Sequence, residues 1–287
     1  MVPASHVKKG SKMTSMVEYL RIQRLSASIC HTLISQSPRH ARHQFESSSD
    51  DATEASDMGV AIHDLFLEGR DRLVVIDAAD WRTKAAKEAR DFARSQGSIP
   101  VLKDREPFIT GAVKAAQAFV KSSKLAGIFD TGKPEQTILF TAEGVECKCR
   151  PDWLPEQDFI IHVKTTSGSA EPSSWIRNQL FGMGYDIAAC FYELALAGRQ
   201  SIFLVIEQAP PHGCSWVALA PAAWELAYGK TKQAIQTWKL CLAGGHWPCY
   251  RSDVHYAEPF AWQVKDEQQR EVDRAYDGLQ AERGLQV

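Results

Sequence analysis

Residues 144–164 read GVECKCRPDWLPEQDFIIHVK, and this stretch carries the strongest structural signal in the chain. Its two runs rich in apolar residues predict neighbouring β-strands. Alternate residues of a strand share one face, so His162 and Lys164 are expected to point to the same side of the second strand. Asp152 stands at the end of the first strand. We therefore expect these three side chains to meet where the adjacent strands end.

This combination of side chains has the chemistry of a divalent-metal site with a cation beside it. A metal held by Asp152, His162 and the backbone carbonyl of Val163 would neutralise charge on a phosphate and lower the pKa of a water molecule. Lys164 would orient that water or stabilise the transition state. Alone, Asp152 would pass for a turn residue after Pro151; the lysine in register favours a ligand. The pattern therefore indicates phosphodiester cleavage, with Asp152 and Lys164 as catalytic residues.

The first half of the chain is predicted to be mostly helical. Residues 1–15 are expected to be a disordered tail, and residues 16–46 to be helical with a break at Pro38. The acidic stretch 46–57 is expected to be a flexible loop. Further helices are predicted from Met58 onward, over 82–96 and over 104–127.

Strands dominate the second half. Residues 136–142 and 145–152 form a predicted hairpin that turns at Glu143-Gly144, and a strand at 158–164 follows. The remaining expected elements are a long helix at 173–197, strands at 201–207 and 214–220, and a helix at 222–243. This order predicts an α/β fold, a mixed central β-sheet flanked by helices with a helical N-terminal region.

The composition is that of a globular protein. The 287 residues are 44% hydrophobic and 24% charged, enough to bury a core in one large domain or two small ones. The net charge of −2 neither indicates nor excludes nucleic-acid binding, because a local basic path is what matters. The longest apolar runs, such as Ile202 to Ile206, are too short to span a bilayer, and the first 20 residues lack a signal-peptide pattern. We therefore expect no membrane contact and a cytoplasmic location.

The seven cysteines indicate no metal or disulfide framework. Their number is odd, and no pair has the C-x-x-C spacing of a zinc or thioredoxin site. We expect reduced thiols, several of them buried.

At this point a family resemblance is visible. Pro151-Asp152, the x-x-Lys tail at 162–164 and Thr165-Thr166 resemble the PD-(D/E)xK nuclease signature. More narrowly, the chain is similar to the phage-type exodeoxyribonuclease VIII family. The resembling segments follow the family's order: LSAS (25–28), Ser37-Pro38, MGVAIHDLFLEG (58–69), RTKAAKEAR (82–90), PEQ (134–136), ECKCRPDWL (146–154), VKTT (163–166), GYDIAACFY (184–192) and WPCY (247–250).

The resemblance implies an enzyme like lambda exonuclease, which requires Mg²⁺, assembles into rings and digests one strand of linear double-stranded DNA from the 5′ end. It also implies a role in phage or prophage recombination, with the exposed strand passed to a single-strand annealing protein. The PD-(D/E)xK nuclease domain would occupy residues 57–265. A helical segment and loop (16–56) would precede it, and a C-terminal helical tail (266–287) would follow.

Carried over onto this sequence, the resemblance makes His63 a metal ligand beside Asp152, and Lys164 the catalytic lysine. Glu135, in a Pro-Glu pair, would be an accessory acid, and Tyr192 would lie partly in the site. A histidine on its own is more often structural than a ligand, but the helix motif around His63 favours the ligand role.

Three residues depart from the family's pattern. The family has Asp or Glu where this chain has His162, Gln where it has Ala188, and Gly where it has Cys249. Imidazole in place of a carboxylate removes a negative charge and favours Mn²⁺ over Mg²⁺. Two outcomes stay open: a working site with this changed metal preference, or an impaired enzyme that only binds DNA ends. A structural or inhibitory relative that binds the annealing protein is a third hypothesis.

Lys148, Arg150 and Arg177 are candidates for a DNA path, in which contacts to phosphates give affinity without sequence preference. A solvated charged face is the competing interpretation of these residues. The tryptophans from Trp175 to Trp262 are expected in the core or at oligomer contacts rather than under stacked bases.

Overall fold

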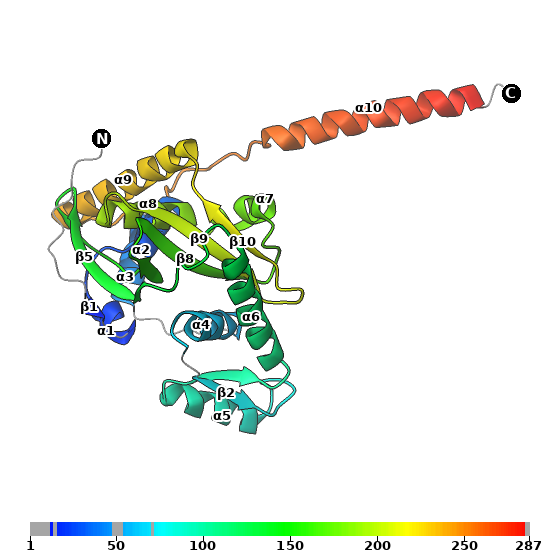
Figure 1. Cartoon of the computed structure of the whole chain (residues 1–287). Coiled ribbons are helices and arrows are strands. Elements are labelled where there is room, and N and C mark those ends of the chain that lie inside the picture. Colours follow the sequence, from blue (N-terminus) through cyan, green and yellow to red (C-terminus); the bar gives the residue numbers. More distant parts are fainter. Residues whose placement is uncertain (1–11, 14–15, 48–53, 70–71, 285–287) are drawn as a thin grey trace. The chain divides into compact units, whose positions relative to one another are not determined.

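The computed structural model describes residues 12–13, 16–47, 54–69 and 72–284, and Figure 1 shows the whole chain. Contacts between residues divide it into two units after Cys249. The first unit, Met1–Cys249, contains the sheets and all predicted site residues. The second, Tyr250–Val287, contains the helix α10 (Ala261–Gly284). Among the described helices, none has both the length and the apolar character needed to cross a lipid bilayer.

A five-stranded mixed sheet forms the centre of the first unit. Its strand order is β10 (Cys214–Ala218), β9 (Gln200–Glu207), β8 (Phe159–Thr166), β7 (Trp153–Pro155) and β4 (Gly132–Pro134). Strands β8 and β9 run parallel, whereas the other neighbours run antiparallel. β9 is almost continuously apolar because it is covered on both faces, as expected of a central strand.

Helices cover both faces of this sheet, as Figure 1 shows. On one face, α4 (Glu54–Leu67) and α6 (Glu106–Ser122) pack Ile62 and Ile109 against Val163 and Leu204. On the other face, Phe203 packs against residues of α7 (Pro172–Trp175), α8 (Tyr185–Ala195) and α9 (Pro221–Gly244). The predicted α/β architecture with a mixed central sheet is confirmed.

A separate β-hairpin precedes Asp152 in the chain and leads into the predicted site. β5 (Gln136–Ala142) and β6 (Val145–Cys149) pair antiparallel, and β1 (Lys12–Met13) adds to β5. Glu143 and Gly144 have φ of 52° and 79°, the positive values that a tight hairpin turn requires. The predicted hairpin is therefore present. β6 stops at Cys149 rather than 152, because Pro151 has no N–H to continue a ladder.

The N-terminal helical segment consists of three short helices. These are α1 (Met16–Arg21), α2 (Ala27–Ser35) and α3 (Pro38–Glu46), and the Ser37 side chain caps α3 by accepting from His40 N–H. Leu25 and Ile29 are buried in the core, whereas Leu20, near the end of α1, is exposed. The predicted tail 1–15 lies outside the described residues except for β1. Residues 48–53 of the predicted loop also lie outside them, and α4 begins at Glu54.

The predicted long helix over 173–197 is wrong. The chain forms α7, a π-helical turn η1 (Ile176–Leu180), and then α8. Gly184, with φ of 69°, ends the first part and begins α8, and the His31 ring of α2 lies against it so closely that a Cβ would overlap the ring. This break positions Tyr185 beside the predicted site.

Two strands of the structure have no counterpart among the predicted elements. The parallel pair β2 (Leu73–Ile76) and β3 (Ile99–Leu102), joined through α5 (Lys84–Ser95), was not expected from the sequence. These strands have only four residues each, too few for a clear periodicity. In α9 the buried positions follow Ala227 at helical spacing, and Leu226 is 55% exposed.

All seven cysteines are free thiols, as expected. Five of them are buried, and Cys214 and Cys249 are half-buried. Burial raises the pKa of Cys214 to about 11.

Replacing Gly184 with alanine is expected to lower the free energy of unfolding by about 3 kcal/mol. The left-handed backbone costs roughly 1–2 kcal/mol for a residue with a Cβ, and overlap with His31 adds about 1–3 kcal/mol. Gly198→Ala is the matched control, because Gly198 has φ of 90° and its Cβ would meet no atom within 4 Å. That control should lose only about 1 kcal/mol. Urea unfolding measures both variants, and equal losses would contradict the close packing of α2 on Gly184.

Candidate metal centre

Three side chains with metal-ligand chemistry converge from separate parts of the first unit. His63 lies on α4, Glu135 lies between β4 and β5, and Asp152 lies between β6 and β7. Their ligand atoms all lie within 4.8 Å of one another. The Nε2 atom of His63 is 3.3 Å from Glu135 Oε1 and 3.5 Å from Asp152 Oδ1.

The Asp152 carboxylate is fixed by the central strand. Its Oδ2 accepts the backbone N–H of Val163 at 2.7 Å and lies 3.3 Å from Lys164 Nζ. The N–H of Glu135 donates to the backbone carbonyl of Asp152 at 3.2 Å. Asp152 and Lys164 therefore share one side of the sheet at contact distance, and Asp152 also ties the Glu135 turn to the strands.

Glu135 is held in a conformation that residues with a Cβ rarely adopt. Its φ is 53°, in the left-handed region. The Arg150 guanidinium lies 2.8 Å from Glu135 Oε2 and donates through Nε to the Glu135 carbonyl at 3.3 Å. Both side chains are about one-tenth exposed. The second carboxylate oxygen, Oε1, faces His63.

The electrostatics of the centre follow from burial and these contacts. Burial raises the pKa of Glu135 to about 7, and the nearby Asp152 charge adds to this rise. Burial would also raise the pKa of Asp152, but Lys164 and His63 hold it well below its ordinary value. Burial would lower the pKa of Lys164 and of His63, yet the Asp152 carboxylate raises both. Near neutral pH the site thus combines an ionised Asp152, a charged Lys164 and a Glu135 that is half protonated.

Tyr185 borders the lysine from the first turn of α8. Lys164 Nζ lies 5.6 Å from the centre of the Tyr185 ring, and this ring stacks on Trp175. Such a contact stabilises the ammonium. Sequence reasoning did not single out Tyr185, since its position depends on the break at Gly184.

His162 lies outside this group of three. Its ring is buried between Phe203 and Tyr192, with centroid distances of 4.9 and 5.0 Å. Its Nε2 is 3.2 Å from Ser201 Oγ, on the neighbouring strand β9. Burial, opposed by Asp152, lowers the pKa of His162 to about 3, so the imidazole is neutral. The ring lies on the strand face of Lys164, and its Nε2 contacts Ser201 of β9.

The remaining predicted site residues have defined partners. The N–H of Val163 holds Asp152, while a ligand role for its carbonyl stays a prediction. The Tyr192 hydroxyl donates to the Arg150 carbonyl at 3.4 Å. Ala188 packs in the core formed by α2, α8 and the β5–β6 hairpin.

Of the three predicted DNA-contacting residues, only Arg177 is exposed. The Lys148 ammonium donates to the backbone carbonyls of Tyr19 at 2.8 Å and of Leu20 at 3.3 Å, at the end of α1. The Arg150 guanidinium forms an ion pair with the Glu135 carboxylate. Lys148 and Arg150 thus have structural partners inside the protein, which sequence spacing did not indicate.

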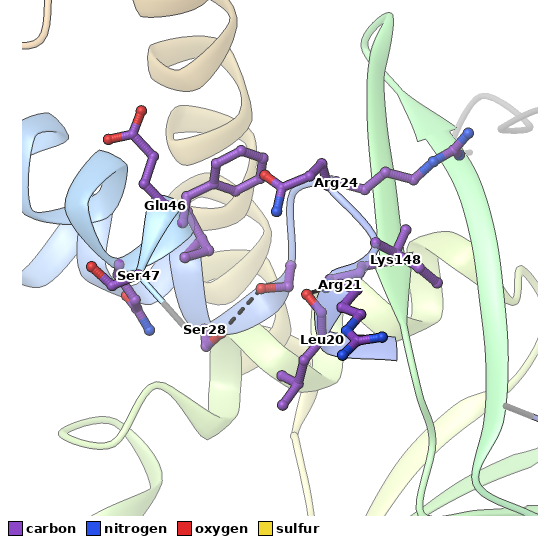
Figure 2. A pocket seen from close by; sticks show the side chains of 13 residues that line it. Leu20, Arg21, Arg24, Ser28, Glu46, Ser47 and Lys148 are labelled. Carbon is purple, nitrogen blue, oxygen red and sulfur yellow. Dashed lines mark hydrogen bonds between the residues drawn. The ribbon is translucent and has the colours of Figure 1, made fainter. Parts of the chain in front are cut away.

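A pocket of about 560 Å³ lies beside Lys148 (Figure 2). Arg21, Arg24 and Lys148 line it together with Ser28 and the end of α3 at Glu46 and Ser47. Arg24 pairs with Glu146 at 2.8 Å, whereas Arg21 is exposed.

The donor set fits a small divalent cation. Two carboxylates and one imidazole, with ligand atoms this close, suit Mn²⁺ and remain compatible with Mg²⁺. The two carboxylates also lie close enough to repel each other, which a cation between them would relieve. His63, Glu135 and Asp152 are therefore the residues that would hold a metal.

Comparison with known proteins gives a family and a fold. The sequence profile of a family described as a PDDEXK-like domain of unknown function (DUF3799) matches residues 26–258. The comparison with curated proteins gave no match.

Solved structures of similar fold include a candidate exonuclease from Eubacterium rectale, at 11% identity and a TM-score of 0.55, covering 89% of this chain and 98% of that one. A phage-related exonuclease from Haemophilus somnus 129PT has 12% identity and a TM-score of 0.34, covering 79% and 99%. An alkaline exonuclease from Laribacter hongkongensis has 12% identity and a TM-score of 0.28, covering 62% and 94%. At these identities the first likeness supports the fold alone, and the other two carry no further argument.

The raised pKa of Glu135 predicts a pH-dependent stability. Its value of about 7 in the folded protein exceeds the ordinary 4.5, so the folded state holds this proton more tightly than the unfolded chain does. This contribution is complete below the ordinary pKa and is lost as the pH rises through 7, which corresponds to about 3 kcal/mol.

Glu135→Gln has no proton to release at this position. Its stability relative to the wild type should therefore increase by that amount as the pH rises through this window. Urea unfolding in EDTA at a series of pH values measures the difference. Parallel pH profiles for the two proteins would show that Glu135 titrates normally.

Proposed function

The chain belongs to the family described as a PDDEXK-like domain of unknown function (DUF3799), and from this premise we propose that it is a metal-dependent nuclease acting on DNA. The observation that carries the proposal is the contact of Lys164 with Asp152, whose other oxygen faces His63 and Glu135. A carboxylate shared between a metal-ligand set and a lysine places two positive charges where hydrolysis of a phosphodiester builds negative charge.

In this proposal each residue has a defined task. His63, Glu135 and Asp152 would hold one divalent cation, which would supply charge neutralisation at the phosphate and a lower pKa of water. Lys164, kept charged by Asp152, would stabilise the negative charge that builds on the phosphate in the transition state. The N–H of Val163 fixes Asp152, so the ligand does not reorient during the reaction.

The more specific proposal is a 5′-to-3′ exonuclease on linear double-stranded DNA. It rests on the resemblance of the ordered motifs to the exodeoxyribonuclease VIII family. With it come the proposed cofactor Mg²⁺ or Mn²⁺, a ring-like assembly of several copies, and a single-strand annealing protein as partner in phage or prophage recombination. The cytoplasm is the proposed place of action.

A second candidate is a catalytically impaired protein that binds DNA ends. The observation that favours it is the neutral His162, which stands where the family has an acid and is hydrogen-bonded to Ser201. For the enzyme to remain active, Glu135 would have to supply the negative charge that His162 lacks.

Lys164→Ala and Asp152→Asn are each expected to lower the release of nucleotides from linear duplex DNA by at least about 100-fold, since each removes a group that acts on charge in the transition state. The assay follows acid-soluble nucleotide from end-labelled duplex with Mg²⁺ and then with Mn²⁺. Closed circular DNA is the control for the need of an end. Binding to ends without release by the wild type would support the impaired protein instead.

Glu135 and His162 can be compared directly. Glu135→Gln is expected to lower activity by about 100-fold, on the scale of losing one group that stabilises charge. His162→Gln retains a hydrogen-bonding group for Ser201 and should lower activity by less than about tenfold. Initial rates with Mn²⁺ and Mg²⁺ measure both. The opposite ranking would mean that His162, rather than Glu135, contributes to the metal site.

A further inference from the structure

Arg150 contacts Glu135 at two separate points. Its Nη1 pairs with the Oε2 carboxylate oxygen at 2.8 Å, and its Nε donates to the Glu135 backbone carbonyl at 3.3 Å. One guanidinium thus restrains both the main chain and the side chain of the same residue. The geometry leaves Oε1 as the oxygen directed toward His63, 3.3 Å from its Nε2.

The guanidinium is itself fixed by other elements. Nη1 also lies 3.2 Å from Met16 Sδ of α1, and the guanidinium carbon is 5.9 Å from the centre of the Tyr19 ring. The Tyr192 hydroxyl donates to the Arg150 backbone carbonyl. The side chain of Arg150 is only 10% exposed. An arginine this enclosed is badly placed to reach a DNA phosphate, the role expected from sequence.

Glu135 needs such a restraint for two physical reasons. Its left-handed backbone costs free energy and persists only where the surroundings fix it. Its carboxylate also faces the ionised Asp152, and two like charges at this range repel. Without a positive charge beside Oε2, the Glu135 side chain would be driven away from Asp152. Arg150 supplies that charge on the side away from His63.

We propose that Arg150 is a positioning residue that holds Glu135 ready to bind the metal. It fixes the backbone turn and neutralises Oε2, so that Oε1 is presented beside His63 and Asp152 before the metal arrives. This inference rests on the proposed metal centre. It also brings α1 into the support of the site, although Met16 and Tyr19 lie before the family match that begins at residue 26.

The test measures binding of Mn²⁺ itself, by electron paramagnetic resonance of the free and bound ion in full-length protein at about pH 8, above the Glu135 pKa of about 7. The wild type should bind one Mn²⁺ at this centre, and Asp152→Asn should abolish that binding. Arg150→Met should weaken the affinity by at least about tenfold, the usual scale for losing a group that orients a metal ligand. Arg150→Lys keeps a charge without the two-point contact, so its Mn²⁺ affinity should lie between those of the wild type and Arg150→Met.

A double-mutant cycle separates positioning from general damage. In a Glu135→Gln background, Arg150→Met should cause little further loss, because its effect passes through the missing carboxylate. Arg94→Met is the matched control, since Arg94 pairs with the buried Asp57 at 2.6 Å on α5 and α4. That variant should keep the wild-type Mn²⁺ affinity. Circular dichroism identifies variants that do not fold. If Arg150→Met is one of them, the Mn²⁺ affinity of Arg150→Lys provides the test.

The outcomes distinguish the proposed metal centre from the positioning role of Arg150. No Mn²⁺ binding by the wild type, or binding unaffected by Asp152→Asn, would overturn the proposed metal centre. Binding that needs Asp152 but is unchanged or tighter in the Arg150 variants would overturn the positioning role alone. Tighter binding would show that the guanidinium competes with the metal. An equal loss with and without the Glu135 carboxylate would also overturn it.

Discussion

The site depends on one carboxylate that is fastened to the central sheet. Oδ2 of Asp152 accepts the N–H of Val163 and contacts the ammonium of Lys164, while Oδ1 faces His63. Because Val163 lies in β8, between β7 and β9, the position of the carboxylate is set by strand pairing rather than by a flexible loop. Losing that hydrogen bond would leave the buried carboxylate with one donor fewer, a cost of about 1.5–3 kcal/mol.

Charge balance explains why the other groups stand where they do. Lys164 and Arg150 each neutralise one carboxylate, Asp152 and Glu135 respectively, and both carboxylates still direct one oxygen toward His63. Two acids brought together in a buried place would otherwise shift their pKa values upward, as Glu135 does in part. The centre is thus assembled by the protein's own cations and retains ligand atoms for an added one.

Much of the fold follows from local patterns in the sequence, and the site follows only in part. Strands β5, β6, β8 and β9 were predictable because their apolar residues and the Glu143-Gly144 turn give clear local signals. The close approach of Asp152 to Lys164 follows from strand parity. The partner of His162 was not predictable, because Ser201 comes from the parallel pairing of β8 with β9, which no spacing encodes. The contact of Arg150 with Glu135 was not predictable either, since it bridges two connections between strands.

The distribution of thiols has a practical consequence for spectroscopy. Five cysteines are enclosed in the core, and burial suppresses the thiolate needed for alkylation, so the half-buried Cys214 and Cys249 are the two sites open to a maleimide dye or spin label. Of these, Cys214 has its pKa raised to about 11 by burial and reacts slowly. Cys249 lies beside Ser37 at the start of α3, far along the chain from β8. A reporter group attached there would follow events at the N-terminal helices while the ligands stay untouched, without any engineered cysteine.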